Sequence, residues 1–472
     1  MKLKKQIFVL GFLVLLLTIV IGVLLISINR SKENKIEQNA EKVTEDTKSK
    51  DEPVDADVAT LENEEMRTSL LKKAEKIAAG YDYDGAIQLL KSNTGYDKYQ
   101  DIVTAVNKYE EMKTKLVKAD VTQIPHIFFH PLIYDTDAAF KNNNDSTSVE
   151  SLNTAMTTVN EFNEILEQLY KNDYVLVRLH DAAKVVKGKG GKKILKEGEI
   201  LLPKGKKPII ISEDDVNYYE KWKYKGVASR LIIDANGKPS CEVDLPGDKT
   251  ITGDYDVAPL LERFIEKHPD FSYKGARAVL VVTGREGVLG YRTSKYVPGE
   301  DTNSKVNSEK DFDLNGEEAI KAKAVAEGLR KAGYELGSHS FVHEGLGYCS
   351  MHLIKYDTKR WKNECESIIG NSDIIIYPKG EDIEHGENGY KYVGSNQRFK
   401  VLSNAGFLFF CNVDGSNPAW TVMGKNYFRQ ARIALDGNVM YYQKDKLKSY
   451  YGLNVKKIWD KGRPKKAPLT TY

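Results

Sequence analysis

The sequence predicts an α/β protein built on a mostly parallel sheet, and two observations lead to this prediction. Apolar residues make up 41% of the 472 residues, enough for a sizeable core. From about residue 124 onward, short apolar runs alternate with amphipathic helical patterns, a βαβα rhythm typical of parallel sheets. A closed barrel and an open, doubly wound sheet are both compatible with this rhythm.

The expected strands are short and rich in branched or aromatic residues: Pro125–Phe129, Tyr174–Leu179, Pro208–Ser212, Ala278–Thr283, Glu335–Ser338, Asp373–Tyr377 and Phe407–Phe410. The expected helices between them carry apolar residues at helical spacing: Ser148–Tyr170, Val257–Lys267, Gly316–Ala332 and Thr358–Ile369.

The first 30 residues have the pattern of a membrane anchor. Ile7–Ile28 is uncharged and apolar, and a helix of this length spans a hydrocarbon core of about 30 Å. Lysines precede it, so the positive-inside rule predicts a single-pass cell-membrane protein with a cytoplasmic N-terminus and an extracellular main domain. A cleaved signal peptide is the alternative. It is disfavoured because the apolar run is longer than about 15 residues and no A-x-A site follows.

The rest of the chain divides into four expected parts. Residues 31–59 are polar and charged, typical of a flexible stalk. Residues 60–119 read as a helical spacer; one hairpin there resembles half of a tetratricopeptide repeat, which is too little for an array. Residues 120–440 form the main domain. Residues 441–472 form a basic, aromatic C-terminal extension, interpreted as packed rather than as a surface arm.

Composition excludes several classes of function. The net charge of +3 is nearly neutral for this length, which argues against nucleic acid as a partner. The lysine-rich run 187–196 is interpreted as a solvated loop. No glycine-rich phosphate-binding motif opens a helix, so we expect no nucleotide. The four cysteines form no C-x-x-C pair, and a bridge between Cys349 and Cys365 stays open as an alternative.

An acidic cluster follows the expected strand Pro208–Ser212. Glu213, Asp214 and Asp215 repel one another unless a cation or hydrogen bonds neutralise them. The carboxyl ends of parallel strands are where such folds build sites. The alternative interpretation is an acidic first turn of the next helix, stabilised by the helix dipole.

Two histidines follow a second expected strand, Glu335–Ser338. His339 and His343 are four residues apart, which predicts two imidazoles on one face of a helical turn, suited to one metal ion. Together with one aspartate they form a three-ligand set with open positions, the pattern of a catalytic metal site. An adjacent carboxylate then serves as a general base. The sequence itself leaves open which of Asp214 and Asp215 has which role.

These residues resemble the motifs of the polysaccharide deacetylase family, also called the NodB homology or carbohydrate esterase 4 family, over about Pro125–Ile433. Ser212-Glu-Asp-Asp-Val216 resembles its T-F-D-D-G motif, and His339-Ser-Phe-Val-His343 matches its H-[ST]-x-x-H motif. The resemblance implies a distorted (β/α)7 barrel with Asp214 as catalytic base. It implies Asp215, His339 and His343 as ligands of a divalent metal, zinc first, with cobalt, nickel or manganese as alternatives.

Ile376-Tyr-Pro-Lys-Gly380 corresponds to the family's R-x-P-x-G groove motif. The chain departs from the family here, because Ile376 stands where the arginine that orients the base is expected. The late L-x-H histidine is also absent from Arg432–Gly437. His130 or His385 then fills its role as general acid, or the leaving amine is protonated in another way. The residues expected to contact substrate are Tyr377, Pro378, Trp420, Glu286 and His130.

The sequence thus favours a metal-dependent hydrolase that removes acetyl groups from a glycan, with peptidoglycan or an exopolysaccharide as the expected partner. Two alternatives stay open. One is a catalytically weak glycan-binding or scaffold module on the same barrel, which the missing arginine and late histidine favour. The other is a hydrolase of a different acyl or amide substrate in the same fold, because fold alone does not choose a substrate.

Overall fold

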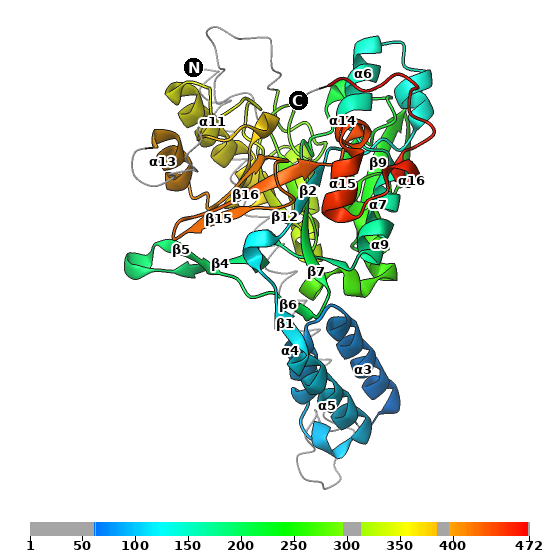
Figure 1. Cartoon of the computed structure of the whole chain (residues 1–472), viewed down its shortest axis with the longest axis vertical. Helices are drawn as coiled ribbons and strands as arrows, with labels where there is room; N and C mark the ends of the chain where they lie inside the picture. Colours follow the sequence, from blue (N-terminus) through cyan, green and yellow to red (C-terminus); the bar gives the residue numbers. More distant parts are fainter. Residues whose placement is uncertain (1–60, 62, 296–312, 385–395, 471–472) are drawn as a thin grey trace, which may run out of the picture. The chain divides into compact units, whose positions relative to one another are not determined.

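The computed structural model describes residue 61 and residues 63–295, 313–384 and 396–470 (Figure 1). By internal contacts the chain divides into Met1–Glu64 and Glu65–Tyr472, and the second unit contains nearly all of the described residues. This division does not test the domain boundaries expected from the sequence, which stay predictions.

The expected placement in the cell membrane is corrected. No helix in the described part of the chain is long and apolar enough to cross a membrane. The longest described helices, α3 (Glu64–Ala79) and α10 (Glu317–Ala332), have 16 residues each and carry many charges, whereas a span needs about 20 mostly apolar residues. The expected anchor Ile7–Ile28 lies outside the described residues.

Seven parallel strands close into a barrel, which confirms the barrel and excludes the open sheet. Each strand pairs with the next, and β7 also pairs with β11, so the ring is complete. In chain order the ring consists of β2 (His126–Phe129), β7 (Lys207–Glu213), β11 (Val279–Val282), β12 (Glu335–Ser338), β13 (Ile374–Ile376), β14 (Phe409–Val413) and β16 (Tyr427–Ala434).

One expected strand lies outside the ring and one ring strand was not expected. β3 (Tyr174–Leu176) lies outside the ring and pairs with the first residues of β7, where Tyr174 lies opposite Lys207. The seventh position is taken by β16, whose buried polar residues Gln430 and Arg432 hid its strand pattern. β15 (Thr421–Gly424) pairs antiparallel with β16 at the outside.

The helices lie around the barrel, and two expected helices are divided or shifted. Ser148–Tyr170 is two helices, α6 (Ser146–Ala155) and α7 (Val159–Lys171), because Thr158 caps α7 in a capping box with Glu161. The expected helix Thr358–Ile369 is the end of α11 (Met351–Glu364) followed by α12 (Glu366–Ile369). The other helices around the barrel are α8 (Leu179–Ala182), α9 (Val257–Lys267) and α13 (Gln397–Asn404).

Further elements extend the barrel. A three-stranded antiparallel sheet contains β8 (Arg230–Ile233), β9 (Pro239–Leu245) and β10 (Lys249–Gly253). Four further strands form two antiparallel pairs: β1 (Leu116–Lys118) pairs with β6 (Leu201–Pro203), and β4 (Ala183–Lys187) pairs with β5 (Lys193–Glu197). The remaining helices are α4 (Tyr83–Lys91), α5 (Gln100–Thr114), α14 (Gly437–Tyr442), α15 (Lys444–Tyr451) and α16 (Val455–Ile458).

The segment after α16 packs on α7. Arg463, whose side chain is fully buried, donates to both carboxylate oxygens of Glu161 at 2.6 and 2.7 Å. Thr158 donates to the Asp460 carboxylate at 2.8 Å. All four cysteines are free thiols, so Cys349 and Cys365 form no bridge.

Buried polar residues lie among apolar ones in the interior of the barrel. His126 on β2 lies between Gln430 and Ser212, with ring-nitrogen distances of 2.9 Å to each. Ser212 in turn accepts from Arg432 at 3.1 Å. Burial and the nearby Arg432 guanidinium lower the pKa of His126 to about 3, so its imidazole is neutral. A buried hydrogen-bonded chain therefore leads along the barrel to Arg432.

Candidate metal centre

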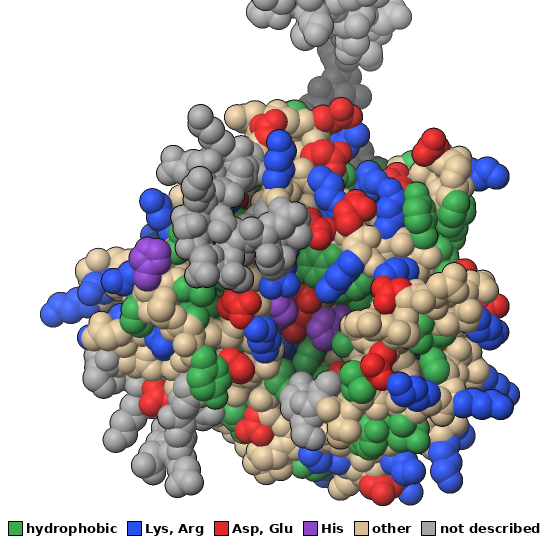
Figure 2. Space-filling model, turned by 90° about the horizontal axis from the view of Figure 1, so that it is seen from above, with side chains coloured by type: hydrophobic (Ala, Val, Ile, Leu, Met, Phe, Trp, Pro, Cys, Tyr) green, Lys and Arg blue, Asp and Glu red, His purple; other side chains and the backbone are tan. Residues whose placement is uncertain are grey.

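The acidic cluster and the two histidines meet at the carboxyl ends of β7 and β12. Asp214 and Asp215 follow β7, and His339 follows β12 directly. Asp214 and His339 are each 2% exposed and Asp215 is 8% exposed, while His343 is partly exposed. Figure 2 shows a central hollow on one face of the molecule, with histidine and acidic side chains at its base.

Asp215, His339 and His343, the three ligands that the resemblance implies, lie together as a group that could hold a metal ion. One ligand atom from each lies within 4.8 Å of the others, and no other group of this kind occurs in the described part of the chain. His343 Nε2 lies 3.6 Å from Asp215 Oδ2. Two ligands bonded at about 2.1 Å to one tetrahedral metal lie roughly 3.4 Å apart, so this spacing fits a bound ion.

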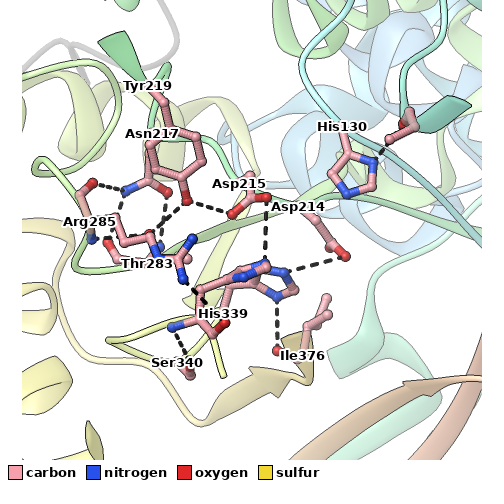
Figure 3. Close-up of polar contacts among 12 residues, drawn as sticks. His130, Asp214, Asp215, Asn217, Tyr219, Thr283, Arg285, His339, Ser340 and Ile376 are labelled. Atoms are coloured by element: carbon pink, nitrogen blue, oxygen red, sulfur yellow. Dashed lines mark hydrogen bonds and ion pairs between the residues drawn. The ribbon is translucent and has the colours of Figure 1, made fainter. Parts of the chain in front are cut away.

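The tautomer of His339 also fits metal binding. Its Nδ1 donates to the backbone carbonyl of Ile376 at 3.0 Å, which leaves Nε2 unprotonated and turned towards the two aspartates (Figure 3). Burial lowers the pKa of His339 and lowers that of His343 to about 4, despite the opposing effect of the neighbouring carboxylates. Both imidazoles are therefore neutral near pH 7, as a metal requires.

The prediction of a helical turn around the two histidines is wrong. Residues Ser340–His343 form an irregular loop, with Ser340 at φ 59° and His343 at φ 54°. The loop is stabilised because Ser340 Oγ accepts from the His343 N–H at 2.9 Å, and Asp357 on α11 accepts from two further N–H groups. Arg285 donates to the Val342 carbonyl at 2.9 and 3.1 Å.

Asp215 is oriented by a tyrosine from its own loop. Tyr219 donates to Asp215 Oδ1 at 2.6 Å, and its hydroxyl also lies 2.9 Å from Thr283 Oγ1 (Figure 3). The second oxygen, Oδ2, faces His343. Burial alone raises the pKa of Asp215, but the histidines and this hydrogen bond lower it well below its usual range, so the carboxylate is ionised.

Asp214 pairs with Arg432 from the opposite side of β2. Arg432 Nη1 donates to Oδ1 at 2.8 Å and Nη2 to Oδ2 at 2.9 Å, a bidentate pair in which both side chains are at most 3% exposed. Burial raises the pKa of Asp214, but Arg432 and His339 outweigh burial, and the net shift is downward. Asp214 is thus an ionised, oriented carboxylate 3.9 Å from His339 Nε2.

Glu213 faces away from the site, which resolves the expected repulsion among three carboxylates. Side chains alternate along a strand, so Glu213 points to the opposite side from Ser212 and Asp214. Its side chain is fully buried in the apolar layer between the barrel and its helices, near Asp256. Burial and the Asp256 charge raise its pKa well above the usual range, so Glu213 is neutral. Asp256 accepts from Tyr218 at 2.5 Å and from the backbone of Leu132 and Val257.

No family model and no curated protein matches the chain. Two solved structures are among those with a similar fold. One is the Streptococcus pyogenes deacetylase PplD in complex with acetate: TM-score 0.34, 12% identity, covering 69% of this chain and 95% of PplD. The other is the BpsB deacetylase domain from Bordetella bronchiseptica: TM-score 0.32, 12% identity, covering 67% of this chain and 98% of that domain. Both similar proteins are deacetylases.

The residues expected to contact substrate fall into two groups. His130 follows β2, and its Nδ1 lies 3.0 Å from the Ala155 carbonyl, while its other nitrogen faces the side of Asp214 (Figure 3). Glu286 accepts from the Glu220 N–H at 2.7 Å and is partly exposed. Their roles stay predictions.

Of the other three expected contacts, Tyr377 and Pro378 are buried, in the segment whose Ile376 carbonyl accepts from His339. Trp420 is partly exposed; its Nε1 donates to Asp414, and the Arg429 guanidinium lies 4.6 Å from its ring centroid. Their substrate contacts also stay predictions.

Sequence reasoning missed the residues that orient the site, of which Arg432 and Tyr219 are the most direct. An arginine within a strand of buried residues was a usable signal, because a buried guanidinium requires a carboxylate partner. Tyr219 lies four residues after Asp215, but nothing in the local sequence indicates its hydrogen bond. His385, the other histidine considered as general acid, lies outside the described residues.

Proposed function

We propose that the protein is a metal-dependent hydrolase that removes acetyl groups from N-acetylated glycan. The observation that carries the proposal is the pairing of a three-residue metal-binding group with an adjacent ionised carboxylate, Asp214, which is not itself part of that group. This arrangement supplies both a metal site and a general base, the two parts that hydrolysis of an amide needs.

Asp215, His339 and His343 fit a divalent metal through one carboxylate and two imidazole donors, a set that zinc accepts and that cobalt, nickel or manganese also tolerate. A metal bound there lowers the pKa of a water molecule and polarises the acetyl carbonyl. Tyr219 orients Asp215, and the Ile376 carbonyl fixes the tautomer of His339.

Asp214 is the proposed base. As water attacks the carbonyl carbon, Asp214 accepts the proton that the water loses, and Arg432 keeps the carboxylate ionised and oriented beforehand. The C–N bond then breaks, acetate leaves, and the sugar nitrogen takes a proton to become an amine.

His130 is the proposed donor of that proton. Its Nδ1 is engaged by the Ala155 carbonyl, so Nε2 is the nitrogen that exchanges protons with substrate. The residue lies close enough to Asp214 and Asp215 for its charge to help lower the pKa of both carboxylates. His130 thus replaces the late histidine that the sequence lacks.

The alternative of a catalytically weak scaffold loses part of its support. That interpretation depended on the missing base-orienting arginine and on the missing late histidine. Arg432 supplies a guanidinium to Asp214 from another strand, whereas the place of the late histidine is filled only by the proposed role of His130.

Acetate release tests the proposal. The purified full chain, loaded with zinc or cobalt, is incubated with chitopentaose and, separately, with an O-acetylated xylan. We expect acetate from chitopentaose and none with Asp214→Asn. Asp248→Asn, an exposed change in the turn between β9 and β10, is the matched control and should retain full activity.

A metal-loaded protein that releases no acetate above the Asp214→Asn level from any N-acetylated glycan would overturn the proposal. Release from the O-acetylated substrate alone would show an esterase instead.

A further inference from the structure

The strands β4 and β5 form a two-stranded ribbon that extends from the barrel (Figure 1). The turn between them contains Gly190 and Gly191, both with positive φ, and a Cβ added at either would meet nothing within 4 Å. Leu195 attaches the ribbon to the body of the protein, since its side chain is buried and its N–H donates to the Lys425 carbonyl at 2.8 Å.

The ribbon is strongly and uniformly basic. No acidic residue occurs between Ala182 and Lys196, and every lysine in this segment is exposed: Lys184, Lys187, Lys189, Lys192, Lys193 and Lys196. The structure therefore corrects the interpretation of 187–196 as a plain solvated loop, because most of these lysines lie on paired strands or at their turn.

The strand register places lysines directly opposite each other. Lys184 pairs with Lys196, and Lys187 pairs with Lys193. Opposed side chains in an antiparallel pair have Cβ atoms about 5 Å apart, and like charges at such positions destabilise the pair. The free protein thus carries a repulsion that a bound polyanion would relieve.

Neighbouring acidic groups do not relieve the repulsion. Within the described residues none of the six lysines forms an ion pair within 4.0 Å; the nearby Glu197 pairs instead with Lys118 at 2.5 Å. Lys193 is close enough to Asp373 to lower its pKa, but that carboxylate already pairs with His180 at 3.1 Å. Lys425 at the base of the ribbon adds another exposed cation.

We propose that the β4–β5 ribbon binds a linear polyanionic glycan. A polymer with regularly spaced carboxylates or phosphodiesters complements a narrow strip of six cations. Nucleic acid is a poorer match, because the ribbon carries no aromatic side chain on which bases stack.

The ribbon lies away from the metal centre. Its base contacts the β15–β16 turn, and the preceding His180 pairs with Glu335, the first residue of β12. These are the amino ends of the barrel strands, whereas the metal centre lies at the carboxyl ends. Binding here retains the protein on a polymer and leaves the catalytic hollow free, so the inference does not depend on the proposed enzymatic activity.

Binding to defined polymers tests the inference. The full chain is titrated with polygalacturonate, with poly(glycerol phosphate) and with uncharged dextran of similar length, at several salt concentrations. The test variant replaces Lys184, Lys187, Lys193 and Lys196 by glutamine. We expect salt-dependent binding to the anionic polymers only, and at low salt an affinity lower by about tenfold or more in the variant.

A matched control carries the same charge change elsewhere: Lys444, Lys448, Lys456 and Lys457, all exposed on α15 and α16, replaced by glutamine. It should bind polygalacturonate as the unchanged protein does. Arginine at the four ribbon positions should also preserve binding. Because the opposed lysines repel, the glutamine variant should melt no lower than the unchanged protein; if it does not fold, Lys187→Gln with Lys193→Gln serves instead.

Three results would overturn the inference. The first is a ribbon variant whose affinity for polygalacturonate stays within twofold of that of the unchanged protein. The second is an equal loss of affinity in the α15–α16 control. The third is tighter binding to a DNA duplex or single strand of equal charge than to either anionic polymer.

Discussion

Arg432 and Asp214 form a bidentate ion pair inside the barrel although 217 residues separate them in the chain. They come from β16 and the end of β7, the two strands that flank β2 in the ring. The guanidinium crosses β2 over the Phe128 ring, 4.0 Å from its centroid, and also donates to Ser212. Closure of the barrel is therefore what places an arginine on the proposed base.

Replacing Arg432 by lysine tests this pair. Lysine retains the charge but loses the planar two-point contact, so Asp214 loses its fixed orientation. We expect kcat for acetate release to fall about 100-fold with little change in KM. Steady-state kinetics on chitopentaose check this.

Arg277→Lys is the matched control, because it weakens another bidentate and largely buried ion pair, with Glu262, at the amino end of β11. Both variants should lose about 1–3 kcal/mol of unfolding free energy, and only Arg432→Lys should lose kcat. Equal kinetic losses in the two would show that Arg432 acts through stability alone.

The metal-binding group predicts a defined stoichiometry. The unchanged protein should bind about one zinc or cobalt ion per chain, and His339→Ala, His343→Ala or Asp215→Asn should each abolish binding at micromolar metal. Elemental analysis after dialysis measures this, with exposed His352→Ala as the control. Full metal content in the His339 variant would contradict the assignment.

Tyr219 should affect metal affinity without being a ligand. Tyr219→Phe removes the 2.6 Å hydrogen bond that orients Asp215, and loss of such a contact typically weakens metal binding 10- to 100-fold. Competition with a chromogenic chelator measures the dissociation constant. Tyr291→Phe, which removes a hydrogen bond to the Leu231 carbonyl, is the control and should bind metal normally.

His180 should make stability depend on pH. Burial opposes its charge, but Asp373 and Glu335 raise its pKa to about 10, above the value of about 6.5 in an unfolded chain. The raised value means that the stabilisation is fully present below about pH 6.5 and is lost as pH rises through about 10. The side chain is 36% exposed, so solvent weakens the effect.

Thermal melts from pH 6 to 10.5 check this. The difference in Tm between the unchanged protein and His180→Gln should be largest at the acidic end and should shrink towards pH 10. A constant difference across the range would show that the ion pairs do not contribute.

Two groups of site residues were visible in the sequence, because the members of each group are close together in the chain. They are the acidic cluster after one strand and the two histidines after another. Strand ends and residue spacing predicted a metal-binding group, and the geometry of Asp215, His339 and His343 agrees with that prediction. The βαβα rhythm likewise predicted the parallel sheet, because period-2 and helical patterns are local properties of the chain.

Only the tertiary structure decided which groups complete the site. Arg432 reaches Asp214 because β16 closes the ring beside β2, and the Ile376 carbonyl fixes His339 because β13 neighbours β12. The loop around the histidines is irregular rather than helical because Asp357, 14 residues after His343, accepts its backbone N–H groups. Such long-range pairs leave no periodic mark in a sequence. The sequence by itself therefore predicted the candidate metal-binding residues, and the tertiary structure determined which side chains orient them.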